Sequence, residues 1–435
     1  MTQKKTLTDF FKDEVRDFSI YSCERNIASG VDGLKPSQRK VVFGMQKKFN
    51  NQEVKVSIAA AGIQEISAYH HGSLEGVIVN MAQNFPGANN MPLLSASGQF
   101  GSRISPEASA SRYISTELTD NFRKLFKPVD NNILEHNEDD GVMVEPKFYL
   151  PVLPTLLLNG SQGMGTGFAS SVFAYNPADV KQNILDLING RTPVPLVPWY
   201  RGFTGTIERD GDQAIITGVL KVVNTTTIEI TELPIGSYTT KYRETLNALE
   251  DRGIVKSYSD DSKKAYTKFV VKVSREVASM EMDKLLQTFK LIKRDSENIT
   301  VWTDDFKIKK FDNVNDYLKW FVAFRLGKYA ERREYMLRAI SADLVRHTEE
   351  IRFIKLYLKR STAWSKMKDA DVREELVADK FENIENLLST PVNKLTGEAI
   401  ERLERELQKL HGEFLTLGGK TSQTLYKEDL AEFKA

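Results

Sequence analysis

No single motif among the residues that could do chemistry identifies a reaction. The glycine-rich stretch 160–167 (GSQGMGTG) lacks the Lys-Ser/Thr of a phosphate-binding P-loop and the spacing of a dinucleotide site, so nucleotide binding there is excluded. His70 and His71 are adjacent, but no multi-cysteine set and no third histidine at a suitable spacing accompanies them, which disfavours a metal site. The absence of a G-x-S-x-G elbow argues against a serine hydrolase.

The local distribution of charge favours phosphate binding, whereas the net charge of the whole chain does not indicate it. Sixty Lys/Arg and 59 Asp/Glu give a formal net charge of +1, which by itself does not indicate a nucleic-acid-binding protein. Residues 25–127, however, contain twelve Lys/Arg against seven Asp/Glu, a local excess of five positive charges. This excess is a modest indication of phosphate binding, and an ordinary solvated surface is the alternative.

The elements that would position these residues change in character along the chain. A helix is expected from Pro36 over PSQRKVVFGMQKKF and another over LEGVIVNMAQNF (74–85), because proline favours a helix start and the apolar residues recur at helical spacing. Residues 144–175 look strand-like but contain three prolines, so they cannot form one central strand. Residues 200–275 alternate between apolar and polar with turn signals, which predicts a β-rich domain.

Beyond Asn313 the sequence predicts long helices. Almost no glycine or proline interrupts residues 314–360, and apolar residues recur there at spacings of three, four or seven. A helix of more than about 25 residues is typical of a coiled-coil arm. A second such helix is expected over residues 396–417, with short helices at about 361–390 forming a compact tip.

The bulk composition indicates a soluble protein of several domains. A chain of 435 residues predicts two to four domains, and 41% hydrophobic with 27% charged residues is ordinary for globular proteins. Neither a membrane span nor a signal peptide is recognisable, so a cytoplasmic location is expected. Cys23 is the only cysteine, which excludes an internal disulfide and leaves a small packing residue.

Several motifs in colinear order resemble those of one family, the type IIA DNA topoisomerases. The segments that resemble the winged-helix cleavage domain of that family are DGLKPSQRK (32–40), YHHG (69–72), QNFPGANNMPLL (83–94), GQFGSR (98–103) and ASRYI (110–114). Those that resemble its later parts are EPKFYLPVLPTLLLNGSQGMGTGF (145–168), WYRGFTGTI (199–207), ITELP (230–234), LLSTPVNKLTGEAIERLERELQKL (387–410) and LYKEDL (425–430). The resemblance covers nearly the whole chain.

The resemblance implies a mixed α/β multidomain fold of the breakage-reunion (A-type) subunit. Its parts are a winged-helix DNA-cleavage domain over 1–175, a β-rich tower domain over 176–312, and a coiled-coil arm with a helical exit gate over 313–435. GANN, the QRK form and GTGF favour the eukaryotic and T-even phage branch over bacterial gyrase. The chain length favours the medium subunit of T-even-like phage enzymes as the nearest relative.

Two residues carry the reaction that the resemblance implies. Tyr113 matches the tyrosine that attacks a backbone phosphodiester and becomes joined to a 5′-phosphate. A phenol suits this task because its bond to phosphorus conserves the energy of the broken strand, so resealing needs no cofactor. Arg112 matches the adjacent arginine, whose guanidinium can hold the scissile phosphate and stabilise charge in the transition state. An Arg-Tyr pair alone would carry no such meaning.

Further residues match DNA-contacting positions of the family. The helix start that contains Lys35, Arg39 and Lys40 is expected to meet DNA phosphates. His71 is expected as a phosphate contact or proton shuttle, against the alternative of a packed structural histidine, with His70 as a DNA contact beside it. Arg103 is a weaker DNA-contact candidate.

Met164 stands where eukaryotic relatives carry an isoleucine that wedges between base pairs and kinks the DNA. Methionine is apolar and flexible, and methionine is among the side chains that intercalate at DNA kinks. The prediction is therefore that Met164 is the wedge. The alternative is a turn methionine packed in the core.

The resemblance also implies partners, because some of the family's functional groups have no match here. Neither the acidic metal-binding cluster nor the ATPase domain is recognisable, so Mg²⁺ and ATP are expected on a separate, larger subunit. This chain alone is then expected to cleave DNA poorly. No DNA-wrapping β-propeller is recognisable either, which favours relaxation and unlinking over supercoiling. Double-stranded DNA and a second copy of the chain, joined in a homodimer, are the other expected partners.

Three rival classes of protein also act on DNA. A nickase needs a His-x-His metal pair, and a tyrosine recombinase needs an Arg-His-Arg set; neither can be assembled from this sequence. The alternative of a different class is a non-enzymatic winged-helix protein that bridges DNA through a coiled-coil dimer arm.

Overall fold

The computed structural model describes residues 6–50, 52–69 and 71–433. The chain divides into two compact units: Met1–Arg325 together with Lys427–Ala435, and Leu326–Tyr426. No helix in the described part of the chain is both long and apolar enough to cross a membrane.

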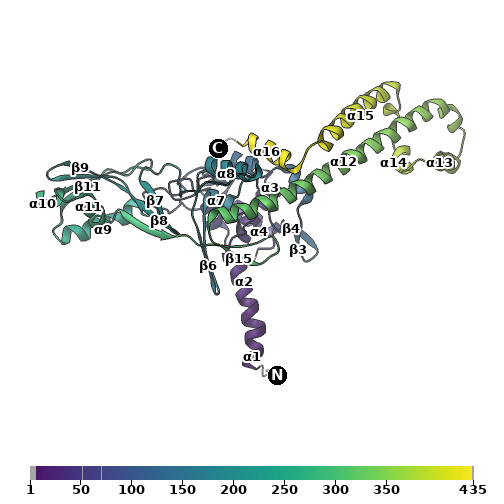
Figure 1. Cartoon of the computed structure of the whole chain (residues 1–435). Coiled ribbons are helices and arrows are strands. Elements are labelled where there is room, and N and C mark those ends of the chain that lie inside the picture. Colours follow the sequence, from purple (N-terminus) through teal and green to yellow (C-terminus); the bar gives the residue numbers. More distant parts are fainter. Residues whose placement is uncertain (1–5, 51, 70, 434–435) are drawn as a thin grey trace. The chain divides into compact units, whose positions relative to one another are not determined.

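The first unit begins with helices, of which α1 and α2 follow one another as one rod (Figure 1). They are α1 (Leu7–Phe10), a π-helical turn at Phe11–Val15, α2 (Arg16–Asn26), α3 (Pro36–Lys47), α4 (Val56–Ile66), α5 (Glu75–Ala82) and α6 (Asp120–Leu125). The helix expected from Pro36 is confirmed, because Pro36 occupies the first turn of α3 and Val41, Val42 and Met45 are fully buried. Strands β1 (Val54–Lys55) and β2 (Ser115–Thr116) pair in a two-stranded sheet within this region.

The proline-interrupted stretch 144–175 folds as the second strand of one hairpin, a short helix and a complete second hairpin. The elements within this stretch are β4 (Val142–Pro146), α7 (Thr155–Asn159), β5 (Ser161–Gly165) and β6 (Phe168–Val172). The 3₁₀ helix Pro128–Ile133 and β3 (His136–Asp139) precede it, and α8 (Pro177–Ile188) follows it. Strand β4 ends at Pro146 and Pro154 caps α7, as expected of a residue that cannot continue a ladder. Strands β5 and β6 form an antiparallel hairpin.

The β-rich region predicted from 200 onward continues to residue 311, and its described strands form three antiparallel sheets. Their strand orders are β11-β12-β10-β9, β13-β8-β7 and β14-β15. The elements are β7 (Thr206–Asp210), β8 (Gln213–Thr217), β9 (Val219–Asn224), β10 (Thr227–Glu232), α9 (Thr239–Asp251), β11 (Val255–Asp260), β12 (Phe269–Val273), α10 (Arg275–Ala278), α11 (Met282–Thr288), β13 (Ile292–Ser296), β14 (Ile299–Trp302) and β15 (Ile308–Phe311). Ile228, Ile230 and Phe269 are completely buried between sheet and helices, as the alternation in the sequence predicts.

The second unit consists of helices. Its elements are most of α12 (Val314–Trp364), then α13 (Asp369–Ala378), α14 (Ile384–Leu388), the 3₁₀ turn Val392–Lys394, α15 (Gly397–Gly418) and the first part of α16 (Ser422–Glu432). Helix α15 runs back beside α12 (Figure 1), and Lys355 on α12 forms an ion pair of 2.8 Å with Glu404 on α15. The two long helices predicted for this region are confirmed.

Candidate functional site

Tyr113 lies in an ordered turn that leaves its phenol in solvent. Its backbone N–H donates to the carbonyl of Ala110 at 2.9 Å, and its side chain is 66% exposed. Two residues later, Ser115 exchanges two backbone hydrogen bonds with Ser97 and pairs with Lys55 across the β1–β2 ladder. The backbone after the tyrosine is therefore held on both sides, while the hydroxyl is free to meet another molecule.

Helix α4 and one glycine complete the support of this turn. The N–H groups of Val56 and Ser57, in the first turn of α4, donate to the carbonyls of Ile114 and Ser111 at 3.1 and 3.4 Å. Gly98 has φ +113°, and a Cβ there would lie 2.9 Å from a methyl group of Ile114. The loop can approach the tyrosine turn this closely only because position 98 has no side chain.

Two cationic side chains flank Tyr113. The guanidinium carbon of Arg112 lies 4.8 Å from the centre of the Tyr113 ring, and the Nζ atom of Lys55 donates to the Tyr113 carbonyl at 3.3 Å. Arg112 and Lys55 are both exposed. A phosphate that approached the phenol would meet both charges. Lys55 is a site residue that the motifs did not reveal, because only the pairing of β1 with β2 brings it to the tyrosine.

His71 lies in a separate hollow of about 480 Å³ in the first unit. The Tyr21 hydroxyl is hydrogen-bonded to Nε2 of His71, and the rings of Tyr69 and His71 meet edge to face at 5.8 Å. Lys35 and the exposed Arg25 also line this hollow. In the described part of the chain the partners of His71 are thus tyrosines other than Tyr113. His70 falls outside the described residues.

The three cations at the start of α3 differ in what they contact. Lys35 donates to the carbonyl of Gln162 on β5 at 2.7 Å, and burial lowers the pKa of its ammonium group. Lys40 is half-buried and forms an ion pair of 2.9 Å with Glu145. Lys35 and Lys40 are also among the residues that line the His71 hollow.

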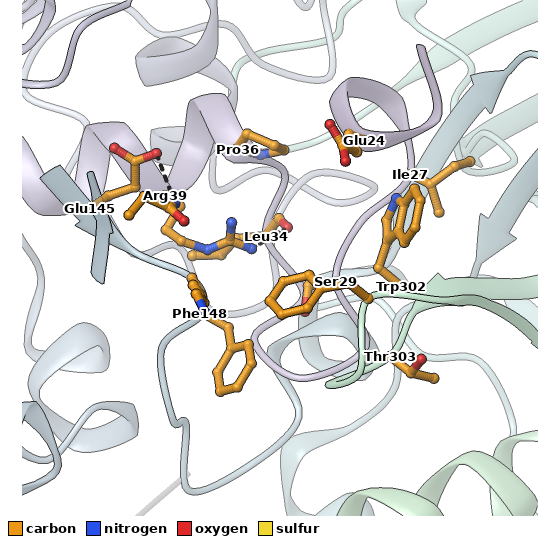
Figure 2. A pocket seen from close by; sticks show the side chains of 13 residues that line it. Glu24, Ile27, Ser29, Leu34, Pro36, Arg39, Glu145, Phe148, Trp302 and Thr303 are labelled. Carbon is orange, nitrogen blue, oxygen red and sulfur yellow. Dashed lines mark hydrogen bonds between the residues drawn. The ribbon is translucent and has the colours of Figure 1, made fainter. Parts of the chain in front are cut away.

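Arg39, in contrast, points inward. Arg39 is 6% exposed, and its guanidinium donates two hydrogen bonds of 2.8 and 3.1 Å to the carboxylate of Asp32, which is fully buried. Figure 2 shows the guanidinium beside a cavity of about 500 Å³ whose walls include Phe148 and Trp302. The expectation that Arg39 contacts DNA is therefore corrected: it is an internal ion-pair partner.

The expectation that Arg103 contacts DNA is also corrected, because Arg103 is likewise buried in an ion pair. It is 5% exposed, its guanidinium lies 2.5 Å from the Glu232 carboxylate, and it donates to the carbonyls of Leu233 and Ser237 at 2.6 and 3.1 Å. These contacts tie the loop before Tyr113 to the end of β10. Arg103 is therefore an internal partner of the Glu232 carboxylate.

We expect loss of Arg39 to cost stability. Arg39→Met leaves the buried Asp32 carboxylate with backbone N–H partners but no counter-charge, which should lower the free energy of unfolding by about 3–5 kcal/mol. Urea unfolding followed by circular dichroism measures this. Arg123→Met is the matched control, because the exposed Arg123–Asp120 pair should contribute less than about 1 kcal/mol. Equal unfolding free energies for the two variants would contradict the internal role.

Met164 is held outward by the hairpin β5–β6, which lies beside α2 (Figure 1). A Cβ at Gly163 would lie 1.8 Å from the Asn26 carbonyl, and one at Gly165 would lie 2.8 Å from the Cα atom of Cys23, so only glycines allow this face of β5 to rest on the helix. Because successive residues of a strand face opposite ways, Met164 points away from α2 and is 80% exposed. It is not a core methionine.

The described residues contain no group of three or more His, Cys, Asp or Glu side chains that could hold a metal ion. The acidic pair Asp139-Asp140 is exposed at the β3–β4 turn, and Asp305 is paired with Lys307. The side chains of the described residues do not fit a divalent-metal site.

The fold and the site together define the class of protein. The structure superposes with a TM-score of 0.90 on the DNA-binding, cleavage and re-ligation domain of Plasmodium falciparum topoisomerase II, with 33% identity, over 97% of this chain and 63% of that one. The mixed α/β fold expected from the sequence, with β-rich parts and a long helix, is thereby confirmed.

The family of A-type subunits of DNA gyrase/topoisomerase IV matches residues 25–431, and the chain belongs to this family. It is 33% identical to the mitochondrial DNA topoisomerase 2 of Dictyostelium discoideum, over 99% of this chain and 35% of the relative. It is 36% identical to DNA topoisomerase 2-alpha of Cricetulus griseus, over 98% of this chain and 31% of the relative. The chain thus spans about a third of the length of these curated relatives.

Proposed function

We propose that this chain is the breakage-reunion part of an ATP-dependent type II DNA topoisomerase. In this proposal the Tyr113 oxygen attacks a backbone phosphorus, a bond from tyrosine to the 5′-phosphate forms, and the bond to the 3′-oxygen breaks. The phenol gives up its proton and the 3′-oxygen gains one. The reverse step reseals the strand. The observation that carries the proposal is the exposed phenol on a backbone held from both sides, with Arg112 and Lys55 beside it.

Charge complementarity supports the roles of the surrounding residues. Arg112 and Lys55 would hold the scissile phosphate, since each presents a cation next to the tyrosine. Lys35, Lys40 and His71 line one hollow and would contact the neighbouring phosphates. The cleavage and re-ligation fold of the structural relative favours this enzymatic function over DNA bridging without chemistry.

Met164 is proposed to wedge between base pairs of the cleaved duplex. An 80% exposed apolar side chain on a hairpin is poorly explained by solvation, whereas insertion into a base step would bury it. We expect Met164→Ala to reduce the bend of bound DNA, measured by energy transfer between dyes at the two duplex ends. Met143→Ala, which removes another exposed methionine from the β3–β4 hairpin, should leave the bend unchanged. A wild-type bend in Met164→Ala would refute the wedge.

We propose further that two copies of the chain act together, each cutting one strand so that a second duplex can pass. The proposed domains are the cleavage domain 1–175, the tower 176–312 and the arm and gate 313–435, with dimer contacts at the tip around 361–390. Exposed apolar side chains on that tip support this, among them Val377 at 63%. Sedimentation equilibrium of the intact 49.3 kDa chain should give the mass of a dimer.

Mg²⁺ and ATP are proposed to bind a separate, larger subunit. The described residues contain no cluster of acidic side chains that could hold Mg²⁺, and the curated relatives are about three times as long as the segment they share with this chain. The finer assignment to the medium subunit of a T-even-like phage enzyme, working in the host cytoplasm, belongs to the same proposal. The chain alone should hydrolyse no ATP and cleave DNA weakly; robust ATP-driven strand passage by the lone chain would overturn this assignment.

A further inference from the structure

The turn between β13 and β14 consists of two residues, Glu297 and Asn298, and one of them is bonded to the Met164 hairpin. Asn298 exchanges two backbone hydrogen bonds with Ser171 on β6, at 2.8 and 2.9 Å. Its side-chain Nδ2 also donates to the carbonyl of Ala169 at 2.7 Å. Ala169 is the residue directly opposite Met164 in the β5–β6 ladder. Asn298 therefore holds the hairpin at the level of the exposed methionine.

Glu297 is bonded to the hairpin β7–β8 and also to the segment that follows β6, where the Phe173 N–H donates to its carboxylate at 3.1 Å. Its carboxylate accepts from the Arg209 guanidinium at 2.7 Å, and its backbone N–H donates to the Asp212 carbonyl at 2.8 Å. The same carboxylate accepts from the Tyr175 hydroxyl at 2.8 and 2.9 Å, and the residue is 9% exposed. Arg209 donates in turn to the Tyr175 hydroxyl at 2.7 Å. The charge is thus buried and fully partnered.

We propose that Glu297 and Asn298 are positioning residues that couple the three-stranded sheet β13-β8-β7 to the hairpin β5–β6, which carries Met164. Adjacent residues leave no flexible linker between the two sets of bonds. A displacement of the sheet must either carry Asn298 and the hairpin with it or separate the buried Glu297–Arg209 pair, which is strongly unfavourable. DNA held against the sheet would accordingly set the position of Met164. This inference rests on the wedge role proposed above.

The test is the near-isosteric variant Asn298→Asp in the intact chain, with Mg²⁺ and the larger subunit present. Aspartate keeps the oxygen that accepts from Thr300 but replaces the donor to the Ala169 carbonyl with an anionic oxygen. Its repulsion from that carbonyl should shift the hairpin at Ala169, while the two backbone hydrogen bonds with Ser171 remain. With an unnicked duplex, we expect the bend angle to fall to the value measured for Met164→Ala. The cleavage rate should fall about tenfold, which corresponds to the loss of roughly one hydrogen bond.

A duplex with a nick at the wedge step separates positioning from general damage. Nicked DNA is already easy to deform, so it should restore cleavage by Asn298→Asp if only the wedge is misplaced. Asn224→Asp is the matched control. It makes the same change at an exposed turn of the β-rich region and retains the side-chain oxygen that accepts from the Thr226 N–H. Its bend angle and cleavage rate should equal those of wild type.

Each outcome decides the matter. If Met164→Ala loses the bend and Asn298→Asp does not, the coupling is wrong while the wedge stands. If Met164→Ala bends DNA as wild type does, both the wedge and the coupling fail. If nicked DNA does not restore cleavage by Asn298→Asp, the residue has a general structural role and the coupling is overturned. The proposed role of Tyr113 as nucleophile has its own test in the covalent adduct and is affected by none of these results.

Discussion

Tyr113→Phe is expected to abolish the covalent protein–DNA adduct that denaturant traps during cleavage, without harming the fold. The change removes one oxygen, which is the atom proposed to attack phosphorus. Among the described residues the Tyr113 hydroxyl has no hydrogen-bond partner, and the side chain is 66% exposed, so stability should be unchanged. DNA binding, measured by fluorescence anisotropy, should persist because Arg112 and Lys55 remain.

Tyr266→Phe provides the matched control, since Tyr266 is also exposed but lies in the β-rich region. Its adduct level should equal that of wild type. The position of the trapped protein adds a second discrimination: attachment to both 5′ ends of a broken duplex indicates paired cleavage, and attachment to one strand indicates a nickase. An adduct that survives in Tyr113→Phe would eliminate this residue as the nucleophile, and activity unaffected by the change would favour the bridging alternative.

Arg112→Ala is expected to slow cleavage by about 10²–10³-fold, the usual loss when one donor to a developing negative charge is removed. The Arg112 guanidinium lies 4.8 Å from the Tyr113 ring and is exposed, so it can turn to a bound phosphate without breaking an internal ion pair. Arg112→Lys should recover only part of the rate, because an ammonium group lacks the forked donors that match a phosphate.

Single-turnover cleavage with saturating protein measures the chemical step apart from DNA affinity. Arg123→Ala is the control, because Arg123 is an exposed arginine of the same basic stretch that pairs with Asp120. Its rate should match that of wild type. If Arg112→Ala weakens binding but leaves the single-turnover rate intact, the arginine serves affinity alone and its proposed role in the transition state is wrong.

The sequence by itself determined the local elements and the identity of the nucleophile candidate. Pro36 followed by apolar residues at helical spacing predicts α3, and the near absence of glycine and proline after Asn313 predicts the long α12, because both signals are properties of neighbouring residues. Tyr113 was identified through the order of several short motifs. The prolines between 144 and 175 indicated an interrupted strand, but not the helix α7 that lies within it.

Only the tertiary structure decided which cations are exposed and which are buried in ion pairs. Arg39 and Arg103 belong to the same basic stretch as Arg112, yet each is buried against a carboxylate: Asp32 lies seven positions from Arg39, and Glu232 lies 129 positions from Arg103. Lys55 reaches Tyr113 across 58 positions. Burial and long-range pairing depend on how separate segments pack together, and the spacing of residues along a chain does not encode the distance between them in the fold.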